Sequence, residues 1–260
     1  MPDIRKGFVT QVGMDAEEAI QKAGEFGFDY VEVMMDGENT REALEQRSDT
    51  IRTLLTDHDV ALCVHLPFTV DIGSPHEHVR HGSMEEIRAC IETAAALGVE
   101  KTVLHASSEA WSAAWPEDEI KDNILDGVRE IDGAAVDHGV EICVENIPDG
   151  FFTVQDFPML FDETDAAMTL DTGHARVDGM DGADVGEFVS AYGDRISHIH
   201  LNDTRKGYDD DHVPFGAGNF DFEPMFQHLR DGWTGTLSLE VFTPNWDYIA
   251  MSKEQLDEMI

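Results

Sequence analysis

The sequence is poor in basic residues. Its 260 residues include 17 lysines and arginines against 54 aspartates and glutamates, which gives a formal net charge of −37. Such a surface repels nucleic acids and anionic membranes at low salt. The composition is typical of proteins from halophiles that accumulate molar salt, where screening shortens the Debye length to about 3 Å. We therefore expect a halophilic source, while the acidity says little about the reaction.

Cysteines, long apolar segments and a leader-like start are also missing. The three cysteines, Cys63, Cys90 and Cys143, are too few and too scattered for a disulfide framework. No apolar run reaches the roughly 18 residues that a membrane-spanning helix requires. The first residues, MPDIRKGFV, lack the apolar segment of a signal peptide. These absences favour a globular, reduced, cytoplasmic protein that does not contact membranes.

Apolar strand patterns alternate with amphipathic helical patterns along the whole chain. Eight such units, with no long linker and no low-complexity segment between them, predict a (β/α)8 TIM barrel of the α/β class, formed as one domain over residues 1–260. The alternative is an open, doubly wound sheet. That fold would favour a glycine-rich phosphate loop after the first strand, and GFVTQVGMD is not one.

Side-chain parity along the strands also favours a barrel. Cys63 and His65 share one face of their strand, and His198 and His200 share one face of theirs, while large aliphatic residues occupy the opposite faces. Small and polar groups would then point to the barrel axis. Outside the strands, the pattern predicts one helix over 40–57, a helix capped by Ser83, and a solvated loop that contains the histidines at 76, 78 and 81.

Residues that can bind metal stand at the ends of six predicted strands or shortly after them. The nine candidates are His65, His105, Glu145, Asp171, His174, His200, Asp210, His212 and Glu240. In a TIM barrel, the carboxyl ends of all strands meet at one mouth. Four carboxylates in so small a volume would repel one another unless protons or divalent cations neutralised them. Because mixed imidazole and carboxylate ligands suit zinc or manganese, the sequence predicts a divalent-metal site.

These motifs resemble the xylose isomerase-like TIM-barrel superfamily, which joins sugar isomerases and epimerases with endonuclease IV. The motifs CVEN, LDTGH, HIHLND and LEV match the single-metal site of the epimerases at Glu145, Asp171, His200 and Glu240. The resemblance implies that Glu145 and Glu240 bind the metal and exchange protons with a substrate carbon. It implies that His174 assists catalysis and that Arg205 helps to hold a sugar or sugar phosphate. His198, one layer below His200, is a further candidate behind the substrate.

The same residues resemble endonuclease IV, of AP endonuclease family 2. All nine candidates match the ligands of its three-zinc site, and Phe68 stands where that family has an aromatic residue that helps to open DNA. Two departures concern DNA binding. NIPDGFF, after Glu145, replaces the family's Ala-Gly-Gln-Gly, and VEVMMDGENTRE, after the second strand, lacks basic and aromatic residues that grip DNA.

The resemblance leaves three functions open. The preferred one is a sugar or sugar-phosphate isomerase or epimerase with one metal ion and a small-molecule sugar as its partner. The second is cleavage of DNA at abasic sites with up to three ions, and the third is a non-catalytic metal- or sugar-binding barrel. Asp210 and His212 separate the first two, because a one-metal isomerase does not need them. The sequence is compatible with an oligomer.

Overall fold

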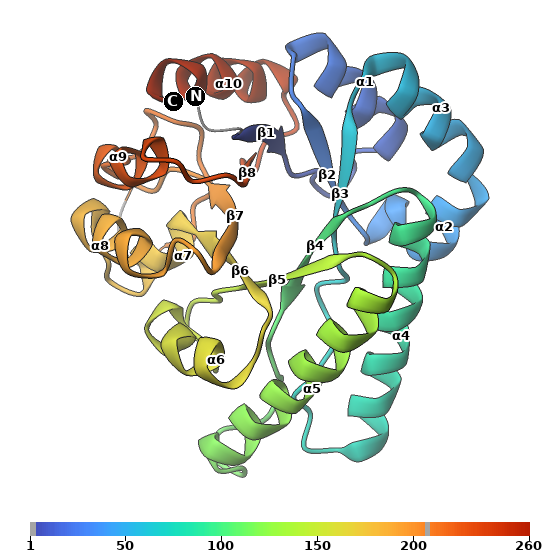
Figure 1. Cartoon of the computed structure of the whole chain (residues 1–260), viewed down its shortest axis with the longest axis vertical. Coiled ribbons are helices and arrows are strands. Elements are labelled where there is room, and N and C mark those ends of the chain that lie inside the picture. The colour runs from blue at the N-terminus through green and yellow to red at the C-terminus, as the bar shows by residue number, and fades with distance from the viewer. Residues whose placement is uncertain (1–3, 206–208) are drawn as a thin grey trace.

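A ring of eight parallel strands forms the centre of the computed structural model, which describes residues 4–205 and 209–260 (Figure 1). The strands are β1 (Arg5–Phe8), β2 (Tyr30–Met34), β3 (Ala61–His65), β4 (Lys101–His105), β5 (Glu141–Glu145), β6 (Ala167–Asp171), β7 (Ile196–Leu201) and β8 (Thr236–Leu239). They pair in the order β1-β8-β7-β6-β5-β4-β3-β2. A parallel bridge between Val9 and Glu32 joins the two ends of this order, where the Thr10 amide donates to the Glu32 carbonyl at 2.8 Å. The predicted TIM barrel is confirmed.

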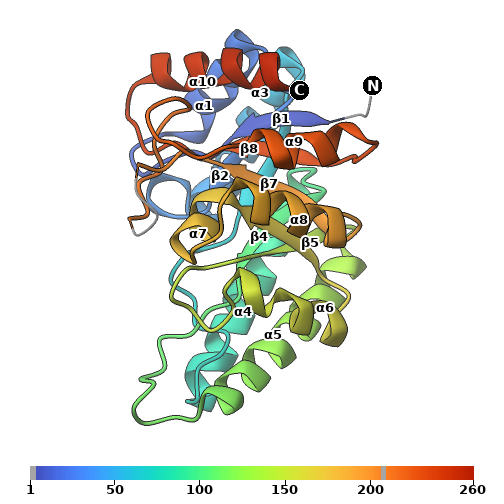
Figure 2. The same cartoon turned by 90° about the vertical axis from the view of Figure 1, so that its left-hand side faces the viewer.

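Helices surround the strands on the outside of the ring, as the two views together show (Figures 1 and 2). They are α1 (Ala16–Phe26), α2 (Arg41–Gln46), α3 (Ser48–His58), α4 (Glu77–Ala96), α5 (Glu117–Asp137), α6 (Phe157–Glu163), α7 (Thr172–Val177), α8 (Gly182–Tyr192), α9 (Glu223–Arg230) and α10 (Trp246–Met259), with short 3-10 turns at η1 (Gly37–Asn39) and η2 (Val154–Asp156). Within the described residues, no helix is both long and apolar enough to cross a membrane.

The two faces of the strands divide as predicted. Leu62 and Val64 on β3 are buried in the apolar core between strands and helices. His198 on β7 and Thr236 on β8 point into the barrel, where the His198 Nδ1 atom contacts the Thr236 hydroxyl. The aliphatic face therefore stabilises the helical layer, and the inward face is left to carry polar groups toward the mouth.

The helix predicted over 40–57 is in fact two helices, α2 and α3, that meet at Arg47. Arg47 has φ −103° and ψ 7°, outside the α-helical range. Its guanidinium group pairs with Asp15 and donates to the Glu38 carbonyl at 2.9 Å and to Asn39 at 3.2 Å. These tertiary contacts with the β2–α2 connection and the start of α1 accompany the break.

The prediction that Ser83 caps a helix was wrong. Helix α4 begins at Glu77, and Ser83 lies within it, where the Ser83 hydroxyl accepts a hydrogen bond from the Asp71 amide at 3.1 Å. His78 and His81 are therefore at exposed positions of a helix rather than in a loop, and His76 directly precedes that helix. The three histidines are exposed to solvent, as expected.

Candidate metal centre

The mouth of the barrel brings the nine predicted ligands together. Their nitrogen and oxygen atoms form three overlapping groups, and within each group the atoms lie within 4.8 Å of one another. We call these the histidine group (His65, His105, Glu145), the central group (Glu145, Asp171, His200, Glu240) and the loop group (Asp171, His174, His212). Asp210 extends the loop group, since its Oδ2 atom lies 3.5 Å from His174 Nε2 and its Oδ1 atom lies 2.9 Å from His212 Nδ1.

Glu145, at the end of β5, is shared by the histidine group and the central group. Its Oε2 atom lies 2.9 Å from His105 Nε2 and 3.3 Å from His65 Nε2. Its Oε1 atom lies 3.1 Å from His200 Nδ1 and 3.4 Å from His174 Nδ1. Both carboxylate oxygens are thus directed at different imidazoles, which is the arrangement of a carboxylate that bridges two metal positions.

Asp171 ends β6 and also begins α7, a short helix that the sequence did not predict. Its Oδ1 atom accepts the His174 amide at 2.6 Å as an N-terminal cap. Its Oδ2 atom accepts the Asn202 side-chain amide at 2.9 Å, and its own backbone amide donates to the Asn146 side chain at 2.8 Å. The cap and the two asparagines fix the carboxylate between the central and loop groups.

Asp203 holds the loop that carries Asp210 and His212. Its carboxylate accepts four backbone amides, from Thr204, Gly216, Gly218 and Phe220, at 2.9–3.1 Å. A Cβ atom at Gly218 would lie 2.2 Å from Asp203 Oδ1, so only glycine fits there. His212 itself has a φ of 43°, in the left-handed region that side chains other than glycine rarely adopt. The folded loop thereby turns the His212 ring toward Glu240, at 3.1 Å.

In several candidate ligand rings, the nitrogen that faces away from the other ligands lies beside a hydrogen-bond acceptor. His65 Nδ1 lies 2.9 Å from the Leu66 carbonyl oxygen, and His174 Nδ1 lies 2.9 Å from the Asn146 carbonyl oxygen. An N–H donated to each carbonyl leaves the Nε2 atom free to bind a metal, a common way of orienting a histidine ligand. For His200 the acceptor is the buried carboxylate of Glu32, at 3.0 Å from Nε2.

Glu32 was missed by the sequence reasoning. A signal was present, because Glu32 is a charged residue in the middle of the apolar strand YVEVM. The parity rule that was applied to the other strands places Glu32 opposite the aliphatic face of Val31 and Val33, and therefore toward the barrel axis.

The carboxylates of the mouth raise the pKa values of two of its histidines, His200 and His212. Burial lowers the pKa of His200, but the carboxylates of Glu32 and Glu145 outweigh it and raise the pKa well above its usual value. Burial likewise opposes protonation of His212, yet Glu240 and Asp210 raise its pKa to about 10. Without a metal, protons on these imidazoles therefore balance the carboxylates.

The donor set fits divalent metal ions. Ligand atoms of both favoured types, imidazole nitrogen and carboxylate oxygen, converge in every group. In addition, the buried His212 Nδ1 atom lies 2.9 Å from Asp210 Oδ1 but has no hydrogen-bond partner of acceptable geometry. A metal ion between these two atoms would satisfy both of them.

The remaining predicted substrate-binding residues lie at different depths. Phe68 is 55% exposed, and its ring packs edge-on to His105 with the ring centres 4.6 Å apart. Arg205 is at the surface, where its guanidinium pairs with Asp211 at 3.1 Å. His198 is fully buried below the mouth and hydrogen-bonds to Glu32 at 2.9 Å. This burial argues against direct contact between His198 and a substrate.

A second aromatic residue at the mouth was not predicted. Phe242, which follows β8, stacks on the His212 ring with a centroid separation of 4.0 Å and an interplanar angle of 4°. It is 53% exposed. The cluster of ligands therefore has exposed phenyl rings beside two of its histidines, Phe68 beside His105 and Phe242 beside His212, and both can contact an entering substrate.

Metal binding at the loop group is expected to strengthen as the pH rises. The folded, metal-free protein holds the proton on His212 up to about pH 10, so an ion must displace this proton at neutral pH. In the metal-free fold, the protonated ring contributes stability below the unfolded pKa of about 6.5, and this is lost as the pH rises through about 10. Below about pH 10 the apparent affinity should therefore increase by about tenfold per pH unit for each proton that the ion displaces, and His174, whose pKa the carboxylates also raise, adds a second such proton. Calorimetric titrations with Zn²⁺ at several pH values measure this affinity. An affinity independent of pH would contradict the prediction.

Ligand-type side chains gathered at the carboxyl end of a parallel barrel define the protein as a TIM barrel with a candidate divalent-metal centre. The chain belongs to the xylose isomerase-like TIM barrel family, whose model matches residues 20–259. The family assignment agrees with the resemblance found in the sequence.

Three similar proteins illustrate the range of this family. The uncharacterized protein MJ1311 of Methanocaldococcus jannaschii is 31% identical, over 93% of this chain and 84% of its own length. A probable endonuclease 4 of Mycobacterium leprae is 25% identical, over 78% of this chain and 81% of its own. The crystal structure of a D-tagatose 3-epimerase-like protein superposes with a TM-score of 0.82 at 29% identity, covering 98% of this chain and 96% of that one. The two relatives with a named activity indicate that this protein is an enzyme.

Proposed function

We propose that this protein is a metal-dependent hydrolase of phosphodiester bonds, with an ion in each of the three ligand groups and abasic-site DNA as its substrate. The observation that carries the proposal is the sharing of ligands between groups. Glu145 connects the histidine and central groups, and Asp210 with His212 completes the loop group. A one-metal isomerase needs only the central group as ligands. His65, His105, Asp210 and His212 would then bind no metal. The isomerase that the sequence favoured stays a prediction.

The charge of the mouth also supports a phosphodiester substrate. Four carboxylates line it, so it can bind several divalent ions. Three divalent ions would outweigh the carboxylates. Arg205 is already paired with Asp211, so the bound ions rather than this arginine would attract the phosphate.

The chain's own residues would have distinct tasks in this reaction. Bound ions would supply Lewis acidity to the phosphodiester and to the attacking water. Glu145 and Asp171 hold the groups at a fixed spacing, because each carboxylate is shared between two of them. Asp210 is the carboxylate that an entering substrate meets first, since its side chain is 41% exposed and that of Glu145 is 1% exposed. Phe68, at the rim, can pack against a displaced sugar or base.

A sugar epimerase is the second candidate, and one specific observation favours it. Glu145 Oε1 and Glu240 Oε2 lie 3.1 Å and 3.2 Å from His200 Nδ1, so two glutamates border the central metal position. Such a pair could remove a proton from a substrate carbon and return it from the other side. The full-length likeness to a D-tagatose 3-epimerase-like structure agrees with this candidate.

Metal content and cleavage assays separate the two candidates. Protein purified gently in high salt should contain about three ions per chain if it is the hydrolase, and about one if it is the epimerase. The hydrolase should cut a duplex at a single abasic site in molar salt, which screens the repulsion between DNA and the acidic surface. A chain with one ion that epimerises ketoses and leaves the duplex intact would refute the proposal.

A further inference from the structure

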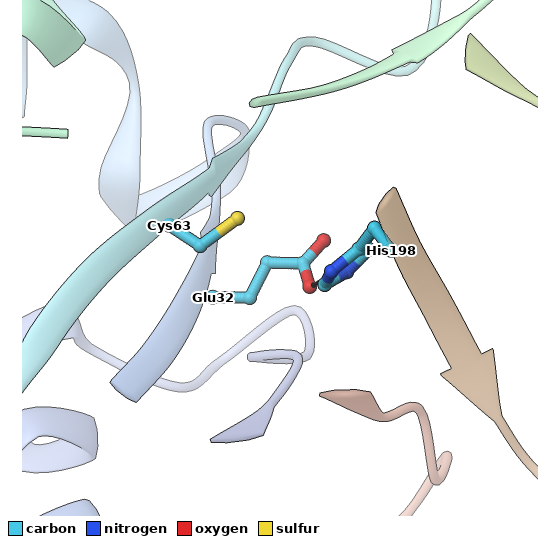
Figure 3. A group of neighbouring side chains, drawn as sticks. All are labelled: Glu32, Cys63 and His198. Carbon is cyan, nitrogen blue, oxygen red and sulfur yellow. Dashed lines mark hydrogen bonds and ion pairs between the residues drawn. The ribbon is translucent and has the colours of Figure 1, made fainter. Parts of the chain in front are cut away.

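Below the mouth, the barrel interior holds a carboxylate that belongs to none of the three ligand groups. Glu32 comes from β2 and is 0% exposed. Figure 3 shows its carboxylate reaching toward His198 on β7, with the Cys63 thiol of β3 directed into the same space. A buried charge is costly unless hydrogen bonds and opposite charge compensate for its lost hydration. The contacts of Glu32 therefore indicate what it does.

Both carboxylate oxygens of Glu32 accept hydrogen bonds. Oε1 lies 3.0 Å from His200 Nε2, and Oε2 lies 2.9 Å from His198 Nε2. Oε2 also accepts the Ser238 hydroxyl, whose oxygen in turn lies 2.8 Å from the Tyr30 hydroxyl. An ionised carboxylate can only accept, so it requires His200 to carry a hydrogen on Nε2.

This requirement determines which atom of His200 faces the mouth. With Nε2 donating to Glu32, the Nδ1 atom points at Glu145 Oε1 and Glu240 Oε2, at 3.1 and 3.2 Å. Nδ1 is then the atom that can bind a metal in the central group. We infer that Glu32 is a positioning residue, which orients the His200 ring and thereby sets the metal affinity of the central group. The inference requires His200 to be a ligand, as both candidate functions do, and is independent of which reaction occurs.

The effect of Glu32 should be confined to the central group. The rings of His65 and His174 are held by backbone carbonyls, which a change at Glu32 does not touch. Of the candidate histidine ligands, all of which lie in the described residues, only His200 hydrogen-bonds to Glu32. A histidine ligand that loses such a partner typically binds its metal about 10- to 100-fold more weakly.

A different use of the same residues is less consistent with their contacts. Glu32, Cys63 and His198 are close enough to hold an ion themselves. However, Glu32 already accepts from three donors. The Cys63 sulfur donates to the Lys101 carbonyl at 3.3 Å, and burial raises the pKa of this thiol well above its usual value. These contacts favour an orienting network over a fourth metal site.

The variant Glu32→Gln tests the inference. The neutral amide has a single oxygen acceptor for the N–H groups of His198 and His200, and it lacks the negative charge that makes the carboxylate a strong acceptor. The His200 ring is therefore held less firmly. We expect an affinity for Co²⁺ or Zn²⁺ that is about 10- to 100-fold weaker for one ion per chain, with the other ions unaffected. Competition with a chromophoric chelator measures this on the full chain in high salt. Unchanged affinity in a folded Glu32→Gln variant overturns the inference.

Cys63→Ala is the matched control, because Cys63 lies in the same buried cluster and, among the described residues, donates its hydrogen bond to Lys101 and makes none to His200. It should bind every ion as tightly as the unaltered chain. If Cys63→Ala loses an ion as Glu32→Gln does, the cluster is itself a metal site and the inference is wrong. A merely structural role for Glu32 would lower the unfolding temperature of the metal-free protein and leave the affinity of the folded protein unchanged.

A measurement on the unaltered protein covers the case in which Glu32→Gln does not fold. In a ¹⁵N NMR spectrum of metal-loaded protein, His200 should keep its hydrogen on Nε2, and its Nδ1 signal should shift when metal is added. A hydrogen on Nδ1, with Nε2 bound to metal, would overturn the inference without any substitution.

Discussion

Replacing Glu145 with glutamine is expected to reduce cleavage of an abasic-site duplex by at least about 1,000-fold, equivalent to roughly 4 kcal/mol of transition-state stabilisation. The substitution keeps the shape of the side chain and removes its charge. Glu145 Oε2 contacts His65 and His105, and Oε1 contacts His200. The loss of the carboxylate charge therefore affects the histidine group and the central group together. Bound metal should fall by about two ions per chain, as measured by atomic absorption beside the rate.

Glu141→Gln provides a control on the same strand. Glu141 begins β5 at the opposite end of the barrel, where it pairs with Lys101 at 3.4 Å and accepts from Ser197 at 2.7 Å. This identical chemical change should leave metal content and rate within about twofold, since the Glu141 side chain is exposed and lies away from the mouth. A Glu145→Gln protein that retained its ions and its activity would disprove the bridging role.

The second large effect is expected from Asp210→Asn, which separates the two candidate functions. Asparagine weakens the contacts to His174 and His212 and should release the ion of the loop group alone. A three-ion hydrolase should lose about 100-fold or more in rate, because phosphoryl chemistry needs charge stabilisation at both the attacking and leaving oxygens. A one-metal epimerase should lose little, since Glu145 and Glu240 stay in place. The rate and the metal content are measured on the same sample.

The neighbouring Asp211 allows a close comparison. Its carboxylate pairs with Arg205 at 3.1 Å and contacts none of the nine ligands through any ion pair in the described part of the chain. Asp211→Asn has the same loss of charge in the same loop, so its metal content should match that of the unaltered chain. Equal losses in both variants would mean that general loop charge, and not ligation by Asp210, is responsible.

The predictability of the fold follows from the way in which its elements are encoded. Eight apolar runs separated by helical patterns are local signals, and alternation of this kind has few topological solutions. Departures occurred where distant residues determine a boundary. The helix over 40–57 is divided at Arg47, whose guanidinium group reaches Asp15 and Asn39. Likewise, α7 begins directly after Asp171, whose carboxylate caps it while also lying in the mouth.

The grouping of the candidate ligands was predictable to the same extent. Nine candidate ligands at strand ends or shortly after them could be named because a parallel barrel brings all its strand ends together. Which of them share an ion could not be named, since this depends on the distances between side chains of different strands. The bridging position of Glu145 and the contact between Asp210 and His174 are of this kind.

The sequence by itself determined the barrel, the identity of the candidate ligands and the acidic surface, because periodicity, strand-end position and composition are properties of the chain alone. Only the tertiary structure decided that Asp210 and His212 join the ligand cluster and that Glu32 lies beneath His200. The physical reason is that a hydrogen bond or a shared ion depends on separations of about 3 Å between residues far apart in the chain. Such separations exist only once the strands are paired and the loop after β7 is folded around Asp203.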